Sequence, residues 1–229
     1  MTSLYQFRHH IDEGTELPCF VLNKILSPEN CDDTVKELKD KVTVAQHQHE
    51  NKLELSQNSD IRDSGVHWFN NPNLSNIIRG CVDIVNYESG WQYDIRDQET
   101  FQFTKYKKDQ HYGWHTDGHG CHKSARKSAN LHNSDTLQYT RQTNLLGTVR
   151  KISVSAILNE DYEGGELQFK TLTPMGKVQI ATVKGNKGDV IVFPSYLNHR
   201  VTPVTLSLIH ISEPTRRTPI SYAVFCLKK

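Results

Sequence analysis

Three residues of this 229-residue chain have the types and spacing of a ligand set for one metal ion. His115 and Asp117 stand two positions apart, and alternate residues of a strand project to the same face. His199 follows the apolar run 189–194, far along the chain. Two imidazoles and one carboxylate leave coordination positions open on the far side of an ion. We therefore expect His115, Asp117 and His199 to be catalytic residues that bind one metal ion.

The two-residue spacing of His115 and Asp117 is a weak signal on its own. His10 and Asp12 repeat it in a polar amino-terminal segment. His115 differs because it ends the aromatic run 112–114, which has the composition of a strand. An open set of two histidines and one carboxylate is typical of non-haem Fe(II) sites, whereas zinc favours a tetrahedral set. The pattern favours Fe(II), and the alternative interpretation is ordinary surface histidines.

Two helices are predicted ahead of these residues. Ser27, Pro28 and Glu29 offer an N-cap, a proline at the first helical position and an acidic first turn. Asn71 and Pro72 begin a second helix in the same way. Apolar residues of the second helix recur at helical spacing, at Leu74, Ile77, Ile78, Val82 and Val85. The region of about 27–89 is therefore expected to form a helical buttress.

The chain after this region has the pattern of a β-rich fold. Short runs of aromatic and β-branched residues, separated by Gly and Asn, occupy 91–95, 100–106, 111–115, 151–158, 166–169, 178–183, 189–193 and 200–204. Such strands after two helices predict a mostly β fold with flanking helices (α+β). We expect a β-sandwich or jelly roll over about 91–205.

The segment 118–148 interrupts this rhythm. It is polar, rich in His, Lys and Asn, and long for a loop in a compact domain, which is typical of a lid. Its His119, Cys121 and His122 are compatible with a soft-metal cluster. Because their surroundings are polar, we favour a solvated loop over a metal site.

Composition narrows the class of protein. The chain has 27 basic and 26 acidic residues and a net charge of +1, which argues against a nucleic-acid partner. No stretch approaches the ~18 apolar residues of a membrane span, and the amino terminus has no apolar leader. Five cysteines without a CxxC pair suit reduced thiols. We therefore expect a cytoplasmic protein with neither a membrane nor a nucleic-acid partner.

Five blocks of the sequence carry a resemblance to a known family. They are Tyr106, 111–118, 150–155, 161–167 and 193–204. In this order they resemble the prolyl 4-hydroxylase-like, PKHD-type branch of the 2-oxoglutarate and Fe(II)-dependent dioxygenases. The similarity runs from about Phe20 to Thr205.

This resemblance implies a double-stranded β-helix that holds Fe(II) through His115, Asp117 and His199. It also implies that Tyr106 hydrogen-bonds the co-substrate 2-oxoglutarate, which is decarboxylated to succinate while O2 hydroxylates a substrate, with ascorbate as a further cofactor. A peptidyl residue is the expected substrate, with proline favoured. Two alternatives stay open: the same chemistry on a small molecule or free amino acid, and a non-catalytic metal-binding jelly roll.

The last part of the chain, residues 206–229, resembles a one-frame translation of the constant parts of a sequencing adapter. We therefore expect a single domain over 1–205, a non-native tail over 206–229, and a natural protein that continues differently after Thr205. Without the charges of this tail the body is mildly acidic. The family's basic anchor for the distal carboxylate of 2-oxoglutarate would fall near Ile209, inside the tail. Co-substrate binding is expected to suffer, since a buried carboxylate needs a charged partner.

Overall fold

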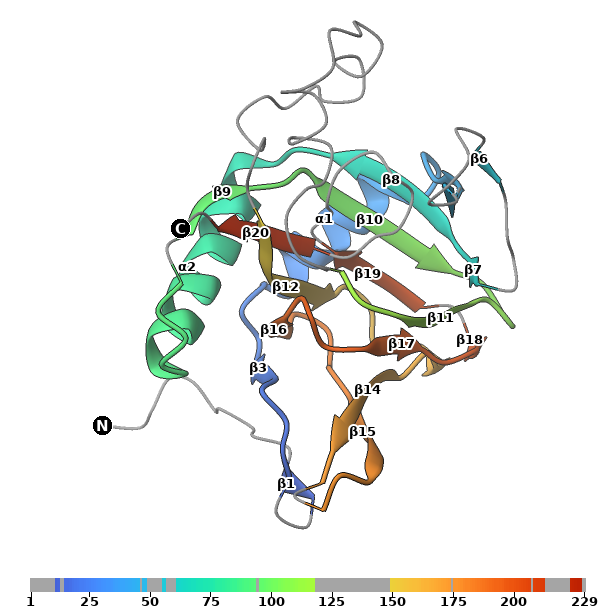
Figure 1. The fold of residues 1–229 in the computed structure, drawn as a ribbon. Coiled ribbons are helices and arrows are strands. Elements are labelled where there is room, and N and C mark those ends of the chain that lie inside the picture. Colours follow the sequence, from blue (N-terminus) through green and yellow to red (C-terminus); the bar gives the residue numbers. More distant parts are fainter. Residues whose placement is uncertain are drawn as a thin grey trace, which may run out of the picture.

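The computed structural model describes ten stretches of the chain: residues 11–12, 15–45, 47–48, 55–56, 61–93, 95–117, 149–173, 175–206, 208–212 and 223–227. Two antiparallel sheets face each other across the interior, and two helices lie against the outer side of the larger sheet (Figure 1). The predicted lid at 118–148, with His119, Cys121 and His122, lies outside the described residues.

The larger sheet has nine strands among the described residues. Its main path runs, in order, through β3 (Phe20–Leu22), β16 (Val190–Pro194), β12 (Val149–Ile157), β19 (Leu208–Ser212), β10 (Phe101–Tyr106), β8 (Gly65–Phe69) and β4 (Thr43–Val44). Off this path, β20 (Ala223–Leu227) pairs with β12 and with β9 (Ile95–Gln98).

The smaller sheet supplies the opposite wall. Its order is β15 (Val178–Val183), β14 (Leu167–Leu172), β17 (His199–Val201), β11 (His111–His115) and β7 (Arg62–Asp63). Three short ladders lie outside both sheets: β1 (Ile11–Asp12) with β2 (Thr15–Glu16), β5 (His47–Gln48) with β6 (Leu55–Ser56), and β13 (Glu163–Gly164) with β18 (Val204–Leu206). Two facing sheets of this kind confirm the predicted jelly roll with flanking helices.

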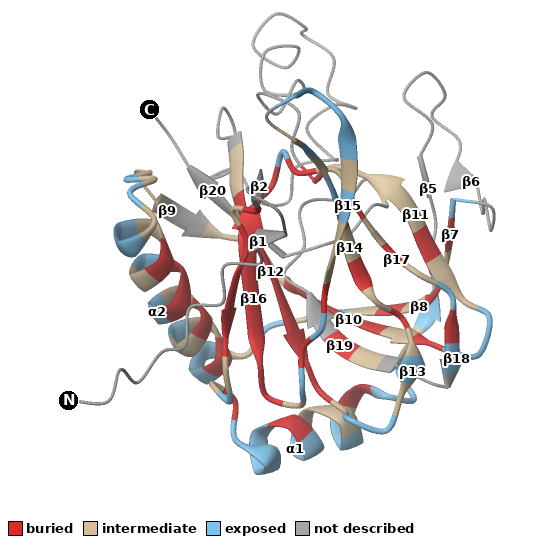
Figure 2. Ribbon diagram, turned by 90° about the horizontal axis from the view of Figure 1, so that it is seen from below, coloured by how far each residue is buried: buried red, intermediate tan, exposed pale blue. Residues whose placement is uncertain are grey.

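The helices α1 (Pro28–Leu38) and α2 (Pro72–Glu88) begin as predicted. The side chain of Ser27 accepts a hydrogen bond from the Asn30 N–H, and that of Asn71 from the Leu74 N–H. Their buried faces join Phe101, Phe103 and neighbouring apolar residues in one core cluster (Figure 2). Neither helix has the length and apolar character to cross a membrane.

The space between the two sheets is apolar at one end and polar at the other. Phe169, Phe193 and Ile191 belong to an apolar cluster between the sheets. Along β10, Phe101 and Phe103 join the helix-side core, so the alternate residues Gln102, Thr104 and Tyr106 face the interior and are also buried. The interior therefore contains buried polar side chains, which need hydrogen-bond partners.

The expected helical buttress over about 27–89 needs a correction. The two helices are present, but β4, β7 and β8 lie between them, and β8 pairs with β10 along five residues. β4 and β7 have only two residues each, and β8 does not alternate between apolar and polar residues, which is why the sequence did not indicate these strands. The run expected at 91–95 also differs, because β9 begins at Ile95.

The region 206–229 contributes two strands to the larger sheet. β19 lies between β10 and β12, and β20 pairs with β12 and β9. The β-branched and aromatic residues of these stretches suit such pairing. The domain boundary at Thr205 and the non-native origin of the tail stay predictions.

A substitution at Gly188 tests whether the turn before β16 has the backbone conformation described. Its φ is +87°, a Cβ there would collide with the Leu26 carbonyl oxygen, and its own carbonyl accepts the Leu26 N–H. Gly188→Ala is expected to lower the free energy of unfolding by at least about 1–3 kcal/mol.

Gly80 is the matched control, since it lies on the exposed side of α2 with open space around it. Gly80→Ala is expected to raise the free energy of unfolding by about 0.5–1 kcal/mol. Urea unfolding of both variants measures the difference. Equal effects of the two changes would contradict the described turn.

Candidate metal centre

A β-bulge in β11 aims His115 into the interior. Tyr112 pairs with Val201 and His115 pairs with His199, so β11 carries one residue more than β17 over this stretch. The Tyr112 and His115 rings therefore lie on the same side and stack with centroids 3.7 Å apart. Gly113, inside the bulge, lies close to the backbone just before β7, and its N–H donates to the Ile61 carbonyl at 2.7 Å.

Both histidine rings are fixed by the backbone. His115 Nδ1 lies 2.7 Å from the Gly113 carbonyl oxygen, and His199 Nδ1 lies 2.8 Å from the Leu197 carbonyl oxygen. Because a carbonyl can only accept, each Nδ1 carries the proton. Each Nε2 then presents its lone pair, which is the form that binds a metal ion.

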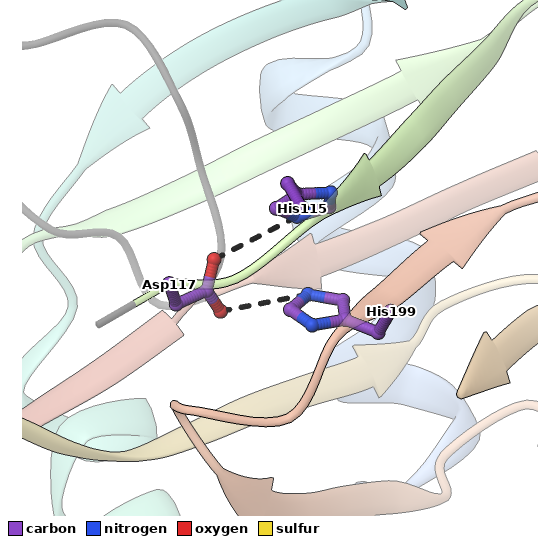
Figure 3. A group of neighbouring side chains, drawn as sticks. All are labelled: His115, Asp117 and His199. Atoms are coloured by element: carbon purple, nitrogen blue, oxygen red, sulfur yellow. Dashed lines mark ion pairs between the residues drawn. The ribbon is translucent and has the colours of Figure 1, made fainter. Parts of the chain in front are cut away.

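The ligand atoms of His115, Asp117 and His199 all lie within 4.8 Å of one another. Figure 3 shows the Asp117 carboxylate pointing between the two rings, with His115 Nε2 3.7 Å from Oδ1 and His199 Nε2 3.6 Å from Oδ2. These separations exceed hydrogen-bond lengths. Two atoms that bind one ion at about 2.1 Å with an angle of about 90–120° are about 3.0–3.6 Å apart. The two distances from Asp117 lie at or just above the upper end of this range, so the cluster comes close to the dimensions of a site for one ion.

Asp117 is placed by hydrogen bonds rather than by strand alternation, because β11 ends at His115. Its N–H donates to the Ser195 carbonyl at 3.0 Å, and its own carbonyl accepts from Arg150 Nη1 at 3.0 Å. The Ser153 hydroxyl donates to Oδ2 at 2.8 Å and lies 3.0 Å from the Ser195 hydroxyl. Oδ1 is buried and accepts no hydrogen bond from the described residues. That oxygen is the one available to a cation.

Burial sets the charge of the site. It raises the pKa of the Asp117 carboxyl to about 8, against the lowering effects of the Ser153 hydroxyl and the Arg150 and Arg62 guanidinium groups. It lowers the pKa of His199 to about 4, so this ring is neutral at pH 7. Phe169 and Phe193 pack around His199 and keep it dry. A buried carboxylate beside a neutral His199 and a second imidazole fits a divalent cation, whose charge would offset the cost of ionising Asp117.

The side chain of Tyr106, the predicted co-substrate residue, is fully buried in the interior. Its ring stacks on His210 with centroids 5.5 Å apart, and His210 Nδ1 lies 3.3 Å from the Ser155 hydroxyl. The expected anchor position near Ile209 needs a correction, because Ile209 packs against the helix-side core. His210 is the residue of β19 that faces Tyr106. A one-residue change of register moves a side chain to the other face of a strand, so counting along the sequence could not decide this.

Several residues around the cluster were not predicted. Ser153, Ser195 and Glu99 are buried, and Arg150 lies 3.4 Å from Glu99 through its Nε. Ser153 and Arg150 belong to the block 150–155 of the resemblance, but neither serine nor arginine has a spacing that marks it as a partner of Asp117.

The pKa shift of Asp117 predicts an unusual pH dependence for the metal-free protein. Between pH 6.5 and 8 the folded state keeps a proton on Asp117 that the unfolded state has lost, so stability falls as pH rises. His199 changes stability little in this window, because its lowered pKa costs stability mainly as pH falls from 6.5 towards 4. The expected net loss from pH 6.5 to 8 is about 1 kcal/mol.

Asp117→Asn keeps the size of the side chain and removes the titration. The variant is expected to be more stable than the wild type at pH 8 and to lack this loss. Chemical unfolding of chelator-treated protein at both pH values measures it, with the exposed Asp83→Asn on α2 as control. Identical pH profiles for the wild type and Asp117→Asn would contradict the described burial.

Solved structures show what this fold is similar to. A Pseudomonas putida prolyl-4-hydroxylase aligns with a TM-score of 0.57 and 14% identity over 93% of this chain and 94% of that chain. A collagen prolyl hydroxylase of Paramecium Bursaria Chlorella virus-1, in complex with 2-oxoglutarate, aligns with a TM-score of 0.56 and 17% identity over 92% of this chain and 96% of that chain.

A third solved structure is a Trichoplax adhaerens prolyl hydroxylase in complex with a peptide of the hypoxia inducible factor. It aligns with a TM-score of 0.59 and 14% identity over 92% of this chain and 83% of that chain. At these identities the likeness shows a shared fold, which is the double-stranded β-helix expected from the sequence.

A family model provides the sequence evidence. A search of curated proteins finds no match to this chain. The model of the 2OG-Fe(II) oxygenase superfamily matches residues 101–218, which is more than half of the chain and includes all three residues of the cluster. The chain therefore belongs to the 2OG-Fe(II) oxygenase superfamily, and it is a dioxygenase.

Proposed function

We propose that this dioxygenase holds Fe(II) through His115, Asp117 and His199 and hydroxylates a peptidyl residue, with proline favoured. The observation that carries the proposal is the cluster itself: two imidazoles with protonated Nδ1 atoms and one buried carboxylate, all within reach of one ion. Bound Fe(II) would supply the centre at which O2 and 2-oxoglutarate react.

The protein's own residues prepare this centre in three ways. The Gly113 and Leu197 carbonyls hold the Nδ1 protons, so both Nε2 atoms are ready to bind without losing a proton. The Ser153 hydroxyl occupies Oδ2 of Asp117 and leaves Oδ1 to the ion. Three ligands from the protein leave coordination positions for a bidentate co-substrate and for O2.

The co-substrate would lie along the polar face of β10 in this proposal. Tyr106 and Thr104 are buried there; Thr104 pairs with His210 of β19, and the Tyr106 ring stacks on the ring of His210. Hydroxyl groups of this kind hydrogen-bond a carboxylate or a keto oxygen. The family resemblance implies this same role for Tyr106.

A peptide substrate is supported by the likeness to a prolyl hydroxylase that was solved with a peptide. A free amino acid or another small molecule remains the alternative within the same chemistry. Succinate release from 2-oxoglutarate in the presence of Fe(II) and ascorbate, compared between proline-containing peptides and free proline, tests the two. Succinate release with neither would favour another substrate, and binding of metal without any release would favour the non-catalytic jelly roll.

Ascorbate and a cytoplasmic location are part of the same proposal. Ascorbate would keep the metal as Fe(II), as the family resemblance implies. Cys19 and Cys31 are buried free thiols, and burial raises the pKa of Cys31 to about 11, which keeps it protonated and unreactive. Thiols of this kind suit a reducing compartment.

Replacing the proposed ligands gives the first test. His115→Ala, Asp117→Ala and His199→Ala are each expected to abolish specific binding of Fe(II), or of Mn(II) as its probe, while the fold is kept, because each removes one of three ligands. Titration calorimetry of the purified variants measures this. His67→Ala on β8 is the control and is expected to bind as the wild type does. Unchanged affinity in His199→Ala would remove that residue from the site.

Turnover by the chain as given is expected to be poor, because β19 presents His210 rather than a basic anchor to the co-substrate. A missing partner for a buried carboxylate costs ~3–5 kcal/mol. That corresponds to binding weaker by about a hundredfold to several thousandfold.

The comparison is with a chimera in which a family-like Gly-Thr-Arg turn and strand follow Thr205. His210→Arg is the smallest change that places a guanidinium on the same face. Succinate release is expected to rise in both. Equal and robust release by the unchanged chain would contradict the missing-anchor argument.

A further inference from the structure

One buried cation in the interior forms no ion pair with any residue that the structure describes. Arg62 on β7 is 3% exposed. Its Nε donates to the Ser64 hydroxyl at 2.8 Å and its Nη2 to the Gln102 side-chain oxygen at 3.0 Å, which are both neutral groups. Among the described residues no carboxylate forms an ion pair with it. A buried charge is costly unless an opposite charge accompanies it.

Arg150, a second arginine near the same site, differs from Arg62 because it has a carboxylate partner. Its Nε lies 3.4 Å from the buried Glu99 carboxylate, and its Nη1 donates to the Asp117 carbonyl. The protein therefore supplies Arg150 with a carboxylate partner and with a backbone carbonyl acceptor. Arg62 has the same chemistry and a deeper position, and it lacks the carboxylate.

Arg62 also lies beside the proposed metal ligands. Its Cζ is 4.7 Å from the centroid of the Tyr112 ring, and the Tyr112 ring stacks on His115 at 3.7 Å. One ring therefore separates the guanidinium from a proposed ligand. The Nη1 group makes no hydrogen bond to the described residues, so a donor remains for a ligand in this part of the interior.

The position along β10 separates Arg62 from the co-substrate region. Arg62 contacts Gln102, whereas His210 pairs with Thr104 and stacks on Tyr106. Gln102 and Tyr106 are four residues apart on one strand, which is about 13 Å at the usual rise per residue. An anion at Arg62 is therefore a different group from the distal carboxylate expected beside Tyr106.

We propose that Arg62 binds a carboxylate of the substrate, so that the residue hydroxylated at this centre has a carboxylate group close to it. This inference rests on the proposed function. It leaves two possible sources for the carboxylate. The carboxylate belongs either to an acidic residue that neighbours the target in a peptide, or to the amino acid itself. The planar fork of arginine suits a carboxylate, which two N–H groups can bind together.

Binding to the full-length chain, both metal-free and loaded with Mn(II), tests the proposal with matched probes. One pair is L-proline and L-prolinamide, and the other is a short proline peptide with a neighbouring Glu and the same peptide with Gln. The carboxylate member of one pair is expected to bind about tenfold to a hundredfold more tightly. The pair that shows the preference identifies the source.

Four variants decide whether Arg62 causes the preference. Arg62→Gln is expected to abolish it, and Arg62→Lys to keep part of it, because the charge stays and the fork is lost. Gln102→Glu is expected to abolish it with Arg62 still present, since the new carboxylate pairs with the guanidinium. The control is Arg200→Gln, because the Arg200 guanidinium lies over Trp114 rather than Tyr112. This variant is expected to keep the preference for the carboxylate probe. Thermal unfolding of each variant reports whether the fold is kept.

Three results would overturn the proposal: no preference within either pair in the wild type, a preference that survives Arg62→Gln, or a loss that falls instead on 2-oxoglutarate relative to 2-oxopentanoate. The last result would assign Arg62 to the co-substrate. Mn(II) affinity, measured on the same wild-type sample, reports on the proposed function separately. Absent Mn(II) binding would contradict the metal site, whereas the probe preference in metal-free protein would still decide the role of Arg62.

Discussion

The fully buried carboxylate of Asp117 is the constraint on which the site depends. Burial favours its protonated form and raises its pKa to about 8, although Ser153 donates to it. An ionised carboxylate in this position needs a positive charge close by. His199 cannot supply that charge, since burial lowers its pKa to about 4 and keeps the ring neutral at pH 7. The fold therefore creates an electrostatic demand that a divalent cation meets, at some cost to the stability of the metal-free protein.

The fold places the three ligand residues close together by pairing strands from distant parts of the chain. β11 and β17 are neighbours in the smaller sheet, so His115 and His199 stand opposite each other as a register pair. Ser195 lies in the turn between β16 and β17 and binds the Asp117 backbone, while Ser153 reaches across from β12 in the larger sheet. The helix-side core supports the larger sheet from behind. Rigid strands rather than loops thus set most of the distances between ligand atoms.

The sequence predicted the parts of the structure that depend on residue type and local spacing. The caps at Ser27 and Asn71 and the three clustered residues are examples, because a cap or a metal ligand needs particular side chains at particular intervals. It did not reveal the strands of five residues or fewer between the helices. Nor did it reveal the bulge in β11, since one extra residue leaves no mark in the pattern of side chains.

Sequence patterns also could not predict which buried side chains contact the site residues. Ser153 and Arg62 look like ordinary polar residues of a strand until the fold brings them to Asp117 and Tyr112. The choice between Ile209 and His210 depends on register, and register is set by pairing with β10 and β12. These features arise from contacts between distant residues rather than from local composition.

X-ray absorption spectroscopy at the iron edge of the anaerobic Fe(II)-loaded protein tests the central claim most directly. The account predicts a six-coordinate centre with only nitrogen and oxygen ligands, including two imidazoles, and one imidazole fewer in His199→Ala. Addition of 2-oxoglutarate to the chimera with the basic anchor should replace weakly held ligands without changing the imidazole count. A sulfur ligand, a tetrahedral centre, or two imidazoles still bound in His199→Ala would contradict the account.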